Sequence, residues 1–142
     1  MKSLLMSIAG AALLLLTIAG AQATAQDDQN NQNGWYQQRE NYYHGEGWHA
    51  RFFERVRLDL DHVQALDFSG ADQDRIVDAK HMLGELQRKY AEGRYDQPQL
   101  DEAIVALRRV VADNSLPVRD RGMLTDDLNR LRDYRAHHEQ WQ

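Results

Sequence analysis

The chain of 142 residues contains no cysteine and only two prolines. Without a thiol it has no disulfide framework, no thiolate zinc site and no cysteine nucleophile. Basic residues are also in the minority, with 17 Lys and Arg against 22 Asp and Glu. This acidic balance argues against a nucleic-acid-binding protein, because such proteins present positive charge to the phosphates.

Recognisable catalytic motifs are missing as well. The sequence has neither a Gly-rich phosphate loop nor the G-x-S-x-G motif of serine hydrolases. Ser69 and Ser115 stand where helices are expected to begin, which predicts capping hydroxyls rather than nucleophiles. We therefore expect a protein that is not an enzyme.

The first 25 residues have the pattern of a secretory signal peptide. Lys2 is their only charged residue, an apolar stretch runs from Leu4 to Ile18, and Ala23 and Ala25 supply the small residues of a cleavage site. The apolar stretch is short for a membrane span of ~20 residues, so we expect cleavage after Ala25 and no span in the mature chain. Residues 1–25 thus predict export, to the periplasm or out of the cell.

Residues 26–46 form a Gln/Asn-rich segment. Nine of the 16 residues from Gln26 to Asn41 are Gln or Asn, and no apolar periodicity interrupts them. Such a segment buries too little surface to offset its conformational entropy, so we expect a disordered tether. In this interpretation its aromatic residues are simply part of a spacer. In the alternative interpretation their rings are a surface on which an envelope polymer stacks.

Residues 47–142 are predicted to form one domain of four amphipathic helices, because apolar residues recur there every three or four positions. Gly93 is a helix-ending residue, and Pro98 and Pro117 stand near helix starts. The expected helices cover about 48–67, 71–92, 97–113 and 116–140. Short connections make sequential helices antiparallel, so the predicted fold is all-α, an up-down antiparallel four-helix bundle.

The outer faces of these helices carry charged pairs and a few apolar residues. We expect Arg55 and Asp59, which are four residues apart, to form a solvated ion pair. Several other pairs of opposite charge have the same spacing and the same expected position. Four aliphatic residues lie off the core stripes and are either ordinary surface or a partner surface: Leu58, Val77, Val105 and Val118.

The best candidate site lies at one end of the predicted bundle. The topology collects aromatic and imidazole side chains there: Trp48, His49, Tyr90, Tyr95, His138 and Trp141. The candidate metal ligands are the two imidazoles of this end and three residues near them in the sequence: His49, His138, His44, Glu46 and His137. Such a set would suit zinc, copper or nickel, and its protonation near pH 6.5 would make it a pH sensor. The alternative is that these rings only close the end of the bundle.

These observations predict a non-enzymatic, exported helical-bundle protein of the bacterial envelope. It would act by binding a protein, a second copy of itself included, or an envelope polymer. In size, signal and helicity the chain is similar to periplasmic helical chaperones of the stress-response type, which implies a chaperone-like form of this function, although their Leu-Thr-x-x-Gln repeat is absent. The alternative function is a periplasmic metal or pH sensor at the imidazole end.

Overall fold

The computed structural model describes residues 33–66, 70–113 and 115–141. All regular secondary structure in these ranges is helical, and they contain no strand. The predicted all-α class is therefore confirmed for this part of the chain. The predicted signal peptide, residues 1–25, and residues 26–32 of the predicted tether lie outside the described residues.

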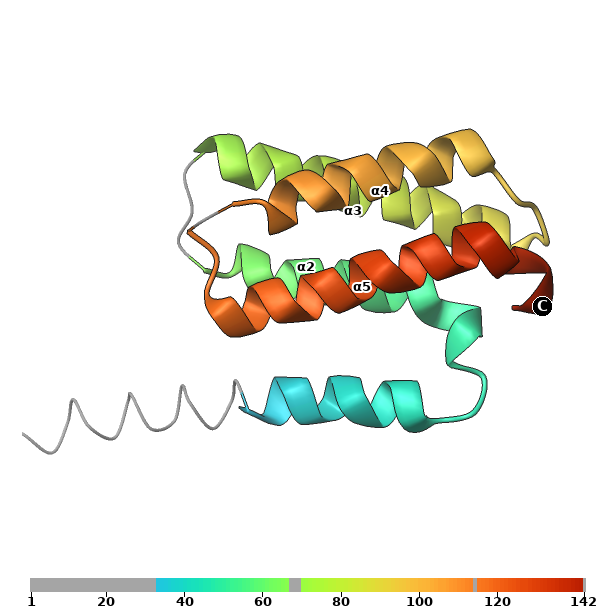
Figure 1. Cartoon of the computed structure of the whole chain (residues 1–142), viewed down its shortest axis with the longest axis horizontal. Coiled ribbons are helices and arrows are strands. Elements are labelled where there is room, and N and C mark those ends of the chain that lie inside the picture. Colours follow the sequence, from blue (N-terminus) through green and yellow to red (C-terminus); the bar gives the residue numbers. More distant parts are fainter. Residues whose placement is uncertain (1–32, 67–69, 114, 142) are drawn as a thin grey trace, which may run out of the picture. The chain divides into compact units, whose positions relative to one another are not determined.

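The chain divides into two units, residues 1–44 and residues 45–142. In the first unit, residues 33–44 are helical, where composition had led us to expect disorder (Figure 1). Gln, Glu and Arg lose little side-chain freedom in a helix, so a polar composition does not prevent one. The Arg39 guanidinium lies 4.9 Å from the Tyr43 ring centroid, a cation–π contact at helical spacing i,i+4.

In the part of the second unit that the structure describes, there are four α-helices and two short 3-10 helices. Their bounds are η1 Trp48–Arg51, α2 Phe52–Gln64, α3 Gly70–Ala91, α4 Gln97–Val111, α5 Val118–His137 and η2 His138–Gln140. The expected first and last helices thus each contain a 3-10 segment. The first α-helix begins only at Phe52, because Arg51 has φ −124° and ψ 24°, outside the α region.

Local sequence sets the turn between α3 and α4. Gly93 has φ +71°, a left-handed conformation that glycine adopts without strain, and this lets the Arg94 amide donate to the Lys89 carbonyl at 2.8 Å. Asp96 caps α4 by accepting from the Gln99 amide at 3.0 Å. Pro98 follows in the first turn, where its missing N–H is no loss.

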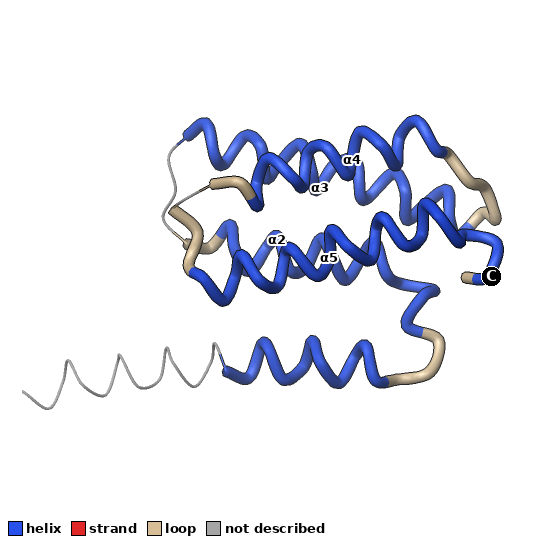
Figure 2. The backbone as a smooth tube through the Cα atoms, in the orientation of Figure 1, coloured by secondary structure: helices blue, strands red, loops and turns tan. Residues whose placement is uncertain are grey.

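Each of the four α-helices contacts two of the others: α3 packs on α2 and α4, and α5 packs on α4 and α2. In Figure 1, α3 and α4 lie side by side above α2 and α5, and Figure 2 shows the connections at alternating ends. The core between them is mainly aliphatic and aromatic, with the charged side chains Arg55, Asp59, Asp120 and Asp127 also buried. Its fully buried large residues are Phe52, Phe53, Leu60, Ile76, Leu83, Leu100, Leu107, Leu124 and Leu131.

The expectation of a solvated Arg55 and Asp59 pair is wrong. Asp59 is 0% exposed and Arg55 8%, and Arg55 Nη2 donates to Asp59 Oδ1 at 3.0 Å. The reason is position: residue 59 is three residues after Val56 and four before Val63, so it lies on the apolar stripe of α2. Residue type alone had assigned it to the outside.

None of the helices in the described ranges is both long and apolar enough to cross a membrane.

Candidate functional site

The predicted gathering of rings at one end of the second unit is present in the structure. We call it the aromatic cluster, and its members are Trp48, His49, Phe52, Phe53, Tyr90, Tyr95, Tyr134, His138 and Trp141. These residues come from η1, α2, the end of α3, the turn before α4, α5 and the C-terminal residues. The cluster therefore joins the beginning and end of the unit.

Trp141 is the centre of the cluster. Its ring centroid lies 5.0 Å from those of Trp48 and Tyr134 and 5.1 Å from that of Phe52. The Tyr90 hydroxyl donates to the Trp141 carbonyl at 2.8 Å, and Trp141 Nε1 donates to Asp133 Oδ2 at 3.2 Å. Trp141 is only 7% exposed, so the cluster packs this C-terminal residue as core.

The imidazole of His138 stacks on Tyr95. Their ring centroids are 3.6 Å apart and the rings are within 4° of parallel. The Tyr95 hydroxyl donates to the Arg135 carbonyl at 3.3 Å, which holds the phenol ring against α5. His49 instead lies beside two indoles, with its centroid 3.9 Å from Trp48 and 4.5 Å from Trp141.

Within the described residues of the second unit, the structure does not bring the predicted metal ligands together into one site. His49 and His138 are held by different aromatic partners, and the exposed His137 places Nδ1 3.1 Å from Asp133 Oδ1. His44 belongs to the other unit, and Glu46 is exposed. Within the described ranges, no three His, Asp or Glu side chains are placed to hold a metal ion. Adjacent residues in a helix project about 100° apart, which separates His137 from His138.

Burial within the cluster raises the pKa values of Tyr90 and Tyr95 and also shifts those of His49 and Tyr134. Desolvation lowers the pKa of His49 below its ordinary 6.5, with Asp133 opposing this shift and Arg130 adding to it. Desolvation also raises the pKa of Tyr134 to about 12, helped by Tyr90 and Tyr95. Both shifts favour the uncharged ring.

The lowered pKa of His49 predicts acid sensitivity. The unfolded chain takes up a proton at this residue more readily than the folded chain. The contribution of His49 to the free energy of unfolding is therefore fully present above pH 6.5 and is lost as the pH falls below it. We expect His49→Gln to reduce the loss of melting temperature between pH 7 and pH 5. The matched control is His81→Gln, on the exposed side of α3. An unchanged pH profile in His49→Gln would contradict the assignment.

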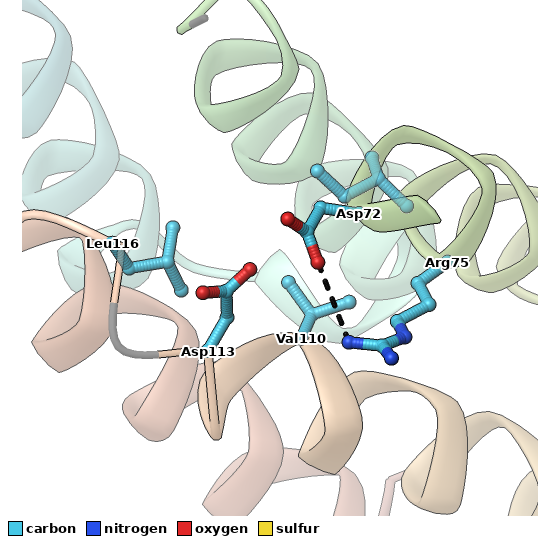
Figure 3. Close-up of a pocket in the computed structure, with 6 residues that line it drawn as sticks. Asp72, Arg75, Val110, Asp113 and Leu116 are labelled. Carbon is cyan, nitrogen blue, oxygen red and sulfur yellow. Dashed lines mark hydrogen bonds and ion pairs between the residues drawn. The ribbon is translucent and has the colours of Figure 1, made fainter. Parts of the chain in front are cut away.

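A small hole at the opposite end is too small for a ligand. Figure 3 shows Asp72, Arg75, Val110, Asp113 and Leu116 around it, with the Arg75 guanidinium 3.3 Å from Asp72. Its volume of about 10 Å³ is at the lower limit for a single water molecule. The Asp113 carboxylate accepts hydrogen bonds from the Ser115 amide and hydroxyl, which lower the pKa of Asp113. These contacts are those of a local turn.

A larger hollow lies on the outer face of α3 and α4, and we call it the α3/α4 groove. It has a volume of about 360 Å³ and is lined by Met82, Asp101, Glu102, Val105, Ala106 and Arg109. Val105 was the one groove residue that the sequence had marked as a partner-surface candidate. The other three candidates lie on different helices, with exposed fractions of 38% for Leu58, 51% for Val77 and 85% for Val118.

Sequence reasoning missed the remaining groove residues. Glu102 and Arg109 are exposed and seven residues apart, with Val105 and Ala106 between them on the same helix. In the sequence, two adjacent apolar residues lie between two opposite charges at helical spacing. This pattern could have predicted the surface.

No protein-family model matches the chain, and no curated protein and no solved structure matches it either. Its function therefore has to be inferred from its own residues.

Proposed function

We propose that the chain is an exported, non-enzymatic helical protein of the bacterial envelope that binds another protein through the α3/α4 groove. Residues 45–142 would form an up-down antiparallel four-helix bundle, carried by a signal peptide into the periplasm or out of the cell. The pattern of residues 1–25 supports export. The two neighbours of each α-helix, together with the short connections, support the bundle.

The observation that carries the binding function is the α3/α4 groove. It is lined by the apolar side chains Met82, Val105 and Ala106, and on α4 the charged residues Glu102 and Arg109 stand on either side of the apolar pair. An apolar centre with a polar rim is the composition of protein-binding surfaces. The groove involves two adjacent helices only, so it favours one defined partner over the wide and mobile surface of a general chaperone.

The aromatic cluster itself is a poor polymer-binding surface, so the polymer alternative stays with the aromatic residues of the segment 26–46. Stacking on a polymer requires exposed ring faces, whereas Phe52, Phe53, Tyr134 and Trp141 are at most 7% exposed. Their faces and edges contact one another. We therefore interpret the cluster as the closure of the unit's end and the groove as the binding surface.

Photo-crosslinking in the intact envelope tests this function. A photoreactive amino acid at Val105, in the full chain, is expected to give protein adducts, and the mature chain is expected to begin at Gln26. The matched control replaces Val118, which is 85% exposed on α5 and outside the groove. Equal adduct yields at both positions would contradict the groove, and a chain that keeps residues 1–25 inside the cell would contradict export.

A further inference from the structure

We propose that the partner in the α3/α4 groove is a second copy of this chain, paired through antiparallel α4 helices. The inference rests on the proposed function and names the partner of the same surface. The two-fold axis would pass between Val105 and Ala106. A two-fold interface brings one patch against itself, so each contact occurs twice.

The outer stripe of α4 has a register that suits such a pairing. Glu102, Val105, Ala106 and Arg109 stand at positions i, i+3, i+4 and i+7, so they share one face of the helix. With the axis midway between Val105 and Ala106, Glu102 of each copy faces Arg109 of the other. Val105 faces Ala106 in the same way. The two charges of each copy are about 10 Å apart along the helix, which separates the two pairs.

Glu102 and Arg109 have no charged partner among the residues of a single copy that the structure describes. Glu102 and Arg109 are both exposed, and neither is in an ion pair with any residue that the structure describes. Asp101, which also lines the groove, differs because Arg135 of α5 already holds it, with Arg135 Nη2 donating to Asp101 Oδ2 at 3.4 Å. The pattern leaves one negative and one positive side chain for contacts between copies.

The apolar residues of the groove allow the helices to approach closely. Ala106 has a small side chain at the centre of the stripe, and Met82 of α3 lies beside it. Methionine is flexible and fills irregular gaps between packed surfaces. Because the patch is small, we expect a reversible dimer that dissociates on dilution.

Reversal of each charge tests the pairing. Glu102→Arg places arginine against Arg109 of the other copy, and Arg109→Glu places glutamate against Glu102. Juxtaposed like charges weaken an interface strongly, so we expect each variant to weaken self-association by about tenfold or more. The double variant Glu102→Arg/Arg109→Glu restores opposite charges and is expected to recover the dimer.

The measurement is sedimentation velocity over a concentration series, on protein purified from cells that express the full chain. The charge-matched control is Arg132→Glu, at an exposed position of α5, and it should leave the dimer unchanged. Far-UV circular dichroism checks that every variant is folded. A wild-type chain that is monomeric at all concentrations, or a dimer indifferent to both reversals, would overturn the pairing. If such a monomer still gave Val105 adducts with another protein, the second copy would be excluded and the binding function would stand.

Discussion

Arg55→Met is expected to lower the free energy of unfolding by about 3–5 kcal/mol, the cost of removing one partner from a buried ion pair. The Asp59 carboxylate is 0% exposed, and the substitution removes the guanidinium that donates to it at 3.0 Å. Methionine fills a similar volume, so lost packing contributes little. The remaining carboxylate stays inside the unit without that charge.

Urea unfolding followed by circular dichroism measures this effect. Arg88→Met is the control, because Arg88 pairs with Glu92 at the same spacing of four residues but on an exposed face. Exposed pairs contribute about 0–1 kcal/mol, so the control should stay near wild type. The double variant Arg55→Met/Asp59→Leu should be less destabilised than Arg55→Met, because it removes the buried carboxylate together with the guanidinium. If Arg55→Met and Arg88→Met had equal and small effects, burial of the Arg55–Asp59 pair would not increase its contribution to the free energy of unfolding.

Trp141→Ala is expected to lower the free energy of unfolding by about 3–5 kcal/mol, as large-to-small substitutions of buried aromatic residues do. Trp141 is the penultimate residue, where truncation usually costs little. Here its ring contacts Trp48, Phe52 and Tyr134, and its indole nitrogen donates to Asp133. Loss of the ring opens a cavity between the beginning and end of the unit.

The same urea experiment tests the role of Trp141. Trp141→Phe retains an aromatic ring but lacks the indole donor, so it should fall between Trp141→Ala and wild type. Val118→Ala is the control for an apolar truncation at an exposed position, and it should change stability by less than about 0.5 kcal/mol. A Trp141→Ala variant as stable as Val118→Ala would mean that the aromatic cluster does not hold the C-terminal residues.

Apolar periodicity was sufficient to predict the α-helices from α2 to α5 and most of their core. The expected helix over 71–92 corresponds to α3, Gly70–Ala91, and the expected helix over 97–113 to α4, Gln97–Val111. Gly93 and Pro98 marked the turn between them for stereochemical reasons that do not depend on tertiary contacts. Once the topology was assumed, the same stripes also predicted the gathering of rings around Trp141.

Features that depend on tertiary contacts could not be predicted in this way. Asp59 is an acidic residue on an apolar stripe, and only the packing of α2 shows that it is buried beside Arg55. In the helix over residues 33–44, Trp35, Tyr36, Tyr42 and Tyr43 recur at helical spacing, but the Gln/Asn-rich composition around them outweighed this short stripe in the prediction. The imidazoles of His49 and His138 were predicted near each other in the fold, but the ring that each one contacts depends on side-chain orientation.

If the outer stripe of α4 is a surface through which two copies bind, mixing two charge-reversal variants should restore the dimer that each variant loses alone. Glu102→Arg alone and Arg109→Glu alone bring like charges together in their own dimers. In a heterodimer of the two variants, one chain carries arginine at both positions and the other carries glutamate at both, so each facing pair has opposite charges. Each variant alone is expected to sediment as a monomer, and an equimolar mixture of the two is expected to sediment as a dimer. A mixture that remains monomeric under conditions where the wild-type chain is a dimer would contradict the pairing.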